Sequence, residues 1–210
     1  MIKVGDKLVD NNLTREELLE RVVIKKTTNR DFDAMCRTIM IGFDLSHLYD
    51  AEEQLTNSQA YMNESVKLVD KYTGDIYGLL TLSDFPITVG SPIMSYEPEI
   101  GKYLSRYNQV NGHSFILDKR LRGLGFDLKM LNFNLKFVTD NFDFVWCGVE
   151  ATLKSNNYWE RMGFIELFNI PVATFYIRPL SKKFLNDIYK KCGNVYGKKI
   201  DYNGRRVGDD

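Results

Sequence analysis

The sequence predicts an α/β protein in which strands and helices alternate within one main domain. Three segments support this prediction. The apolar residues Phe115–Leu117 lead through a short basic turn into a stretch with helical periodicity. A second apolar run, 142–149, precedes another helical stretch that ends at Gly163. Residues 65–69 and 76–82 alternate on either side of a turn, as is typical of an antiparallel hairpin.

Composition and charge limit the possible functions. The chain has 210 residues, 44% of them apolar and 27% charged, which is ordinary for one folded domain with a sizeable core. Its 28 basic and 28 acidic residues cancel without forming a basic block, so neither nucleic acid nor an anionic membrane is an expected partner. The sequence has no apolar segment of membrane-spanning length and no signal-peptide core, which predicts a cytoplasmic protein.

Metal chemistry has no support in the sequence. Cys36, Cys147 and Cys192 are an odd number of cysteines without metal-ligand spacing, so we expect reduced thiols. The two histidines, His47 and His113, are too few for a histidine-based metal site. We therefore expect no bound metal.

The amino-terminal elements are predicted in order from capping and periodicity. Thr14 and Glu17 have the spacing of a capping box, which indicates a short leading helix. Residues 22–26 are the first expected strand. Residues 31–41 are amphipathic and residues 51–63 are more polar, and both are expected to be helical.

The remaining elements follow the hairpin. Residues 86–98, which begin and end with proline, are expected to form an inserted loop. After the two strand–turn–helix segments come two closing strands, a short helix and a polar tail, expected at 164–168, 172–177, 184–189 and 193–210 respectively.

The basic turn at 119–125 is a candidate phosphate site. The first amides of a helix point outward and carry partial positive charge, so a strand, a turn and a helix start together can hold an anion. Gly123 and Gly125 allow close approach of a ligand, and Arg120 and Arg122 add charge. A P-loop is excluded because no Gly-Lys-Ser/Thr follows, and a dinucleotide fingerprint because Leu128 replaces its third small residue.

The turn and the later helix together resemble acetyltransferases of the GNAT superfamily, whose R-x-x-G-x-G/A turn binds the pyrophosphate of acetyl-coenzyme A. Two registers are open. Arg120, Gly123 and Gly125 match the bare pattern, whereas the register that begins at Arg122 keeps the apolar face of the helix in place. We prefer the second register, in which Asp127 stands where the family usually has Gly or Ala.

The resemblance implies a mixed central sheet, splayed in the middle, with helices on both faces. It places the acetyltransferase domain at 22–180, an amino-terminal helical extension at 1–21, and a helix with a flexible tail at 181–210. The backbone of the interior strand is expected to bind the pantetheine arm. The residues expected to contact acetyl-coenzyme A are Phe115, Ile116, Leu117, Arg120, Arg122, Gly123, Leu124, Gly125, Phe126, Asp127, Asn156 and Asn157.

The resemblance also implies an amine acceptor and three candidate catalytic residues. Glu150, at the end of the second interior strand, and His113, at the start of the first, are alternative general bases. The position of the family's usual proton-donating tyrosine holds Trp159, which we expect to pack in the core. Three proton sources remain open: water, the amine itself, and Tyr158, which lies about 100° around the helix from Trp159.

These observations favour an N-acetyltransferase that transfers an acetyl group directly from acetyl-coenzyme A to an amine. Two other readings remain open: a GNAT-like domain that binds or senses acyl-coenzyme A without catalysis, and an unrelated α/β interaction module. Residues 43–63 and 86–103 are the expected walls of the acceptor site, and they mix aromatic and acidic side chains without a dominant charge. Because many relatives pair through their closing strands, a homodimer is an alternative to a monomer.

Overall fold

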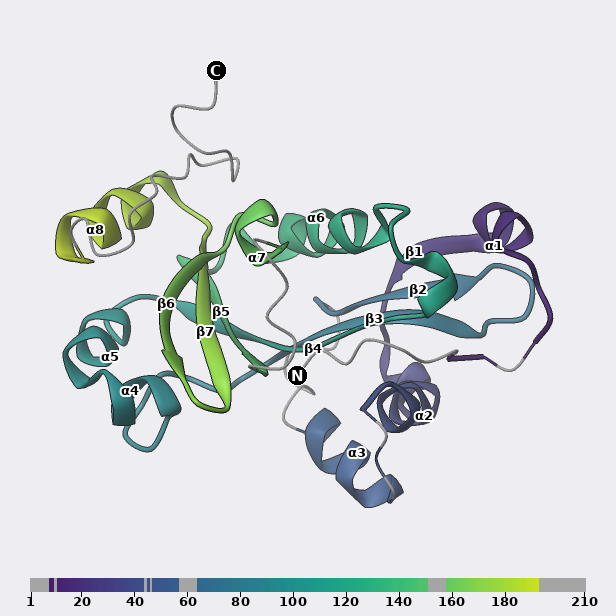
Figure 1. Ribbon diagram of the computed structural model, residues 1–210, viewed down its shortest axis with the longest axis horizontal. Coiled ribbons are helices and arrows are strands. Elements are labelled where there is room, and N and C mark those ends of the chain that lie inside the picture. Colours follow the sequence, from purple (N-terminus) through teal and green to yellow (C-terminus); the bar gives the residue numbers. More distant parts are fainter. Residues whose placement is uncertain are drawn as a thin grey trace. The chain divides into compact units, whose positions relative to one another are not determined.

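The computed structural model describes residues 8–9, 11–43, 45, 47–56, 64–150 and 158–192. Within them, a seven-stranded sheet has the order β1-β2-β3-β4-β5-β7-β6 (Figure 1). The strands are β1 (Val22–Lys26), β2 (Val66–Asp70), β3 (Ile76–Ser83), β4 (Gln109–Leu117), β5 (Phe144–Glu150), β6 (Ile165–Ile170) and β7 (Ala173–Pro179). The helices are α1 (Arg15–Arg21), α2 (Phe32–Phe43), α3 (Leu48–Thr56), α4 (Pro92–Tyr96), α5 (Pro98–Leu104), α6 (Phe126–Val138), α7 (Tyr158–Arg161) and α8 (Lys182–Cys192), with short 3-10 turns η1 (Asn29–Asp31) and η3 (Lys119–Leu121).

The sheet is mixed, as the sequence predicts. β4 and β5 run parallel, with Gln109, Val110 and Asn111 opposite Phe144, Val145 and Trp146. The pairs β1–β2, β2–β3, β5–β7 and β6–β7 are antiparallel. The chain folds into two compact units, the first formed by Met1–Asp84 with Gly112–Val138 and the second by Phe85–Asn111 with Thr139–Asp210.

The first unit has helices on both faces of its strands. Leu79 of β3 packs in a buried cluster with Met35 and Ile39 of α2. A Cβ added to the neighbouring Gly78 would lie 3.1 Å from the Met130 sulfur of α6. Because successive residues of a strand face opposite sides, α2 and α6 cover opposite faces of β3 (Figure 1).

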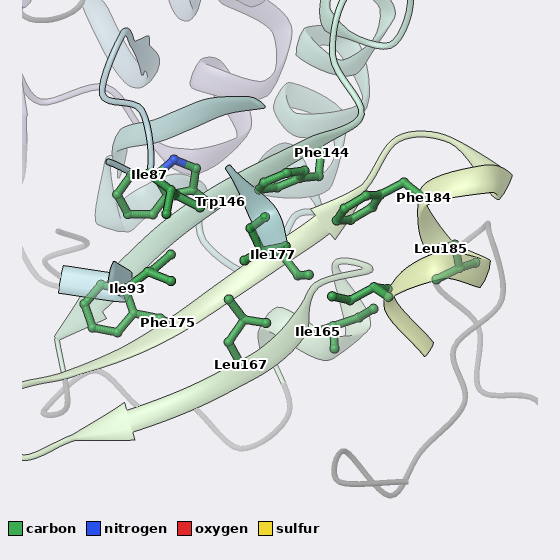
Figure 2. Close-up of a cluster of buried hydrophobic side chains, with 12 residues drawn as sticks. Ile87, Ile93, Phe144, Trp146, Ile165, Leu167, Phe175, Ile177, Phe184 and Leu185 are labelled. Carbon is green, nitrogen blue, oxygen red and sulfur yellow. The ribbon is translucent and has the colours of Figure 1, made fainter. Parts of the chain in front are cut away.

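The second unit has its own core between the strands β5–β7 and the helices α4, α5 and α8 (Figure 2). Phe144 of β5 stacks on Phe184 of α8 with ring centroids 4.6 Å apart. Tyr107 meets the same Phe184 edge-on at 4.9 Å. This aromatic packing fixes α8 against the sheet. The helix is longer than the predicted 184–189 at both ends, and Ser181 caps its earlier start by accepting the Phe184 amide at 3.1 Å.

Several local predictions are confirmed. Thr14 accepts the Glu17 amide at 3.2 Å, and the Glu17 carboxylate accepts the Thr14 amide at 2.7 Å, so the capping box begins α1. The first strand has the predicted bounds. The hairpin forms with Gly74 at φ +82°, a left-handed conformation that favours glycine.

The predicted loop at 86–98 is wrong, because it contains α4 and the start of α5. Ser91 caps α4 by accepting the Met94 amide at 3.2 Å, and Pro92 occupies the first turn of that helix. Pro98 stands in the same place in α5. Proline lacks the amide that a helix start leaves unpaired, so it is suited to this position as well as to loops.

Other boundaries differ by smaller amounts. The helix predicted at 51–63 begins earlier, at Leu48, and is described as far as Thr56. Residues 57–63 and the predicted tail 193–210 lie outside the described residues. Cys36 and Cys147 are buried free thiols, as expected, and burial raises the pKa of Cys147 to about 12. None of the described helices combines the length and apolarity needed to cross a bilayer.

Candidate functional site

The connection between β4 and α6 lies wholly in the first unit and is shaped by two glycines. Asp118 caps the 3-10 turn η3 by accepting the Arg120 amide at 3.0 Å. The chain then passes through Gly123 at φ +70° and Gly125 at φ +73°, and α6 begins at the next residue. Because L-residues with a Cβ rarely adopt these angles, both glycines are required by the backbone path.

This connection leaves backbone donors exposed. The amides of residues 123–126 donate no hydrogen bond to any residue that the structure describes. Gly123 and Gly125 are exposed, and a Cβ on Gly125 would meet nothing within 4 Å. The 13-residue helix α6 adds the positive end of its dipole at the same place. The arrangement is suited to an anion such as a phosphate group.

Asp127 has a local structural role. Its Oδ1 accepts the amide of Leu128 at 2.9 Å, within the first turn of α6. A carboxylate in the first helical turn is stabilised by the helix dipole. This contact accounts for an aspartate at a position where the GNAT pattern usually has Gly or Ala.

All three side-chain nitrogens of Arg120 donate hydrogen bonds to acceptors within the protein. Its Nε and Nη2 each donate to a different carboxylate oxygen of Asp118 at 2.9 Å. Nη2 also donates to the Val9 carbonyl at 3.1 Å, and Nη1 donates to Oδ1 of Asn11 at 2.8 Å. Asp118 is fully buried. Burial alone would raise its pKa, but the hydrogen bonds from Arg120 outweigh burial and hold the pKa of Asp118 below its usual range.

Arg122, the arginine of the preferred register, forms a hydrogen bond through its side chain and another through its backbone carbonyl. Its Nη2 donates to the Leu117 carbonyl at 3.4 Å, and its own carbonyl accepts from Nη2 of Arg15 at 2.9 Å. Neither Arg15 nor Asp118 was identified as a site residue from the sequence. The only local signal was the Asp118-x-Arg120 spacing at a strand end, since the contacts with residues 8–15 join segments about a hundred residues apart.

The interior strand supplies the predicted pantetheine-binding backbone, Phe115–Leu117. The Ile116 side chain is buried against α2, where Gly42 leaves so little room that an added Cβ would lie 2.7 Å from Ile116 Cγ2. The amide of Asp118 donates to the Tyr77 carbonyl of β3 at 2.8 Å. These contacts fix the strand's position in the first unit, and its contact with coenzyme stays a prediction.

His113 lies on β4 and is partly buried. Loss of hydration on burial lowers the pKa of His113 to about 4. Its imidazole is therefore neutral at pH 7, as a general base requires, but it binds a proton weakly. The structure thus places one of the two candidate bases in an environment that reduces its basicity.

Trp159 packs in the core of the second unit, as predicted. It is 6% exposed, and its ring meets Phe164 edge-on at 5.2 Å and Tyr158 edge-on at 5.4 Å. The predicted left-handed cap of this helix is confirmed at Gly163, with φ +84°. Tyr158 is partly buried at the first residue of α7.

The structure gives partial information on the remaining predicted residues. Glu150 is the last residue of β5 and lies opposite Ala173 of β7, but its side chain is outside the described part of the chain. Asn156 and Asn157 fall in 151–157, which is also outside it. No group of His, Cys, Asp and Glu that could hold a metal ion occurs among the residues that are described.

Solved structures of acetyltransferases share this fold. No protein-family model matches the chain, and no curated sequence matches it. The GNAT family N-acetyltransferase YhbS from Escherichia coli, in complex with CoA, aligns over 79% of this chain and 85% of its own, with 15% identity and a TM-score of 0.54. The NatC complex bound to Gag peptide and CoA aligns over 77% and 99%, with 18% identity and a TM-score of 0.53.

A third structure, an acetyltransferase of the GNAT family from Staphylococcus aureus Mu50, aligns over 76% of this chain and 99% of its own, with 17% identity and a TM-score of 0.51. These alignments cover most or nearly all of each solved chain. The protein therefore has the fold of the GNAT N-acetyltransferases, as the two sequence segments indicated.

Proposed function

We propose that this protein is an N-acetyltransferase that moves an acetyl group from acetyl-coenzyme A to a primary amine. The observation that carries the proposal is the connection between β4 and α6, where the amides of residues 123–126 donate to no described residue and Gly123 and Gly125 are exposed at the start of a helix. The GNAT fold supports the same conclusion, because two of the similar structures contain CoA and one of these also contains a peptide.

The proposed coenzyme contacts follow from this geometry. The amides that have no described acceptor, with Arg122 beside them, bind the diphosphate of the coenzyme. The backbone of Phe115–Leu117 binds the amide-rich pantetheine arm. Arg120 supports the coenzyme site indirectly. Each of its side-chain nitrogens donates to an acceptor within the protein, and its bonds to Asp118 hold the turn in place.

The proposed chemistry is a direct transfer in a ternary complex. The neutral amine attacks the thioester carbonyl, a carbon–nitrogen bond forms, and the carbon–sulfur bond breaks to release the coenzyme thiolate. Glu150 accepts the amine proton, directly or through water, since the lowered basicity of His113 makes it the weaker alternative. Tyr158 returns a proton to the thiolate, because an indole N–H such as that of Trp159 is far too weak an acid.

Coenzyme binding is the first test. Titration calorimetry with acetyl-coenzyme A should show one saturable site, and a ligand concentration of a hundred times Kd should stabilise the fold by about 2.7 kcal/mol. Absence of both heat and thermal stabilisation at millimolar acetyl-coenzyme A would contradict the proposal.

The base assignment is tested separately by Glu150→Gln. This variant should bind acetyl-coenzyme A like the parent protein but transfer acetyl about a hundredfold more slowly to a responsive amine. Glu20→Gln, on the exposed face of α1, is the matched control and should change neither property. Unchanged turnover in Glu150→Gln would remove Glu150 from the mechanism and leave the coenzyme site intact.

A second candidate function is an acyl-coenzyme A-binding domain with little or no catalysis. It is favoured by Trp159, which occupies the position of the family's usual tyrosine and packs in the core. Saturable coenzyme binding without acetylation of a broad amine panel would support this function over the first.

A further inference from the structure

An amino-terminal strap, defined here as Leu8, Val9 and residues 11–15, is fastened to the connection between β4 and α6. One end is buried: Leu8 is 6% exposed and packs with Met35, Ile39 and Ile116. The other end is Arg15, the first residue of α1, which the Thr14–Glu17 capping box holds at the helix start.

The Asp118–Arg120 pair holds the strap from Leu8 to Asn11. The Leu8 amide donates to Oδ2 of Asp118 at 2.9 Å. Arg120 donates to the Val9 carbonyl at 3.1 Å and to Asn11 Oδ1 at 2.8 Å, and Asn11 in turn donates to the Tyr77 hydroxyl. A buried carboxylate and a guanidinium thus join the strap to the residues that begin the turn.

Arg15 acts on the peptide at the centre of the turn. Its Nη2 donates to the carbonyl of Arg122 at 2.9 Å, and the same nitrogen lies 4.0 Å from the position of a Cβ on Gly123. In a trans peptide the carbonyl and the following amide point in opposite directions. By holding the Arg122 carbonyl, Arg15 therefore directs the Gly123 amide away from α1.

We propose that Arg15 and the Asp118–Arg120 pair are positioning residues for the diphosphate of the coenzyme. They hold the strap and turn so that the Gly123 amide is oriented before the ligand arrives. Pre-orientation raises affinity because less conformational freedom is lost on binding. This inference rests on the proposed function, since the ligand is the same coenzyme, but it assigns a binding role to a helix outside the predicted 22–180 domain.

The test compares coenzyme A with pantetheine, which lacks the diphosphate and the nucleotide, in the full-length chain. Arg15→Ala should weaken binding of coenzyme A about tenfold, the effect of losing one charge-assisted hydrogen bond. Pantetheine affinity and the midpoint of thermal unfolding should match those of the control Arg37→Ala, an exposed arginine of α2. Arg15→Lys, which retains a donor and the charge, should recover most of the affinity.

Three results would overturn the inference. Equal coenzyme A affinity in Arg15→Ala and Arg37→Ala would show that the turn does not need Arg15. Equal losses for coenzyme A and pantetheine would indicate a general structural effect. A weaker salt dependence of coenzyme A binding in Arg15→Ala than in Arg37→Ala would assign Arg15 to direct contact with phosphate. If the parent protein binds no coenzyme A, the proposed function itself fails, which is a distinct result.

Discussion

The turn after β4 and the turn after β2 begin alike but finish differently. Each turn begins at a buried aspartate, Asp118 directly after β4 and Asp70 as the last residue of β2, and each aspartate is paired with an arginine at 2.8–2.9 Å. Each turn then contains a glycine with positive φ. By residue type alone, the two turns look equivalent.

The difference lies in where their amides go. In the hairpin turn, Asp70 accepts the amides of Tyr72 and Thr73 with its carboxylate and that of Gly74 with its carbonyl. The Asp75 amide donates to the Thr73 hydroxyl. In the turn after β4, Asp118 instead accepts from Leu8 and Arg120, and the amides of residues 123–126 have no acceptor among the described residues. We call the hairpin turn closed, because its amides find acceptors within the protein, and such a turn has a structural role. We call the turn after β4 open, because its amides without a described acceptor can donate to a ligand.

Removing the two aspartates should give the largest effects on stability. Asp118→Ala leaves the 15% exposed Arg120 side chain without its partner and should lower the free energy of unfolding by about 3–5 kcal/mol. Asp70→Ala should cost about 2 kcal/mol, since the 25% exposed Arg21 side chain can reach water. Urea unfolding of both variants measures the difference, and equal losses would contradict the tighter role assigned to Asp118.

Replacing one glycine in each turn should separate binding from folding. Gly125→Val and Gly74→Val both force a β-branched residue into a left-handed conformation, and both positions have open space around the Cβ, so each should cost about 1–3 kcal/mol of stability. Only Gly125→Val should weaken acetyl-coenzyme A binding, by about a hundredfold, which is about 2.7 kcal/mol. Calorimetry on the two folded variants measures their affinities for acetyl-coenzyme A. Equal affinities would show that the open turn does not bind the coenzyme.

Local sequence signals predicted most of the helices and strands. The capping box, the alternating strands and the Gly163 cap each depend on residues within a few positions of one another, and the structure contains all of them. The loop prediction at 86–98 failed because Pro92 and Pro98 have the same composition signal in a loop and at a helix start.

The different roles of Arg120 and Arg122 could not be predicted from the sequence. Arg120 and Arg122 are two residues apart and equally basic, but Arg120 bonds to Asp118 and the strap while Arg122 lies beside the open amides. That difference depends on contacts with Val9, Asn11 and Arg15, more than a hundred residues earlier in the chain. Periodicity and spacing carry no information about such contacts.

The titration of His113 should affect stability in a different pH range from that of Asp118 and Asp70. The pKa of His113 falls from 6.5 in the unfolded chain to about 4 in the fold, so the unfolded state binds the extra proton between these values. Stability should therefore decrease as pH falls from about 6.5 to 4, by about 2 kcal/mol, less than the full shift because the side chain is partly exposed. In His113→Gln this slope should disappear when unfolding is measured across that range.

The aspartates should respond at lower pH. The pKa values of Asp118 and Asp70 lie below their ordinary 3.8, because hydrogen bonds from their turns and arginines outweigh the opposing effect of burial. Their contributions are present above the unfolded value and are lost as pH falls further. A slope between pH 6.5 and 4 that persists in His113→Gln would place its origin elsewhere.

The smallest expected effect comes from the cap of α1. Thr14→Ala removes the acceptor of the Glu17 amide and should cost about 1 kcal/mol. Thr73→Ala, in the closed turn, removes contacts with Asp75 at an exposed position and should cost less, about 0.5 kcal/mol.

The two threonine variants should differ in coenzyme affinity. Fraying of α1 frees Arg15 from the Arg122 carbonyl, so Thr14→Ala should weaken coenzyme A binding about threefold, while Thr73→Ala leaves it unchanged. Calorimetry at a temperature well below both unfolding midpoints makes the comparison. If Thr14→Ala loses the expected stability but binds like Thr73→Ala, then the cap stabilises α1 without orienting the open turn, and Arg15 holds the Arg122 carbonyl without help from its helix.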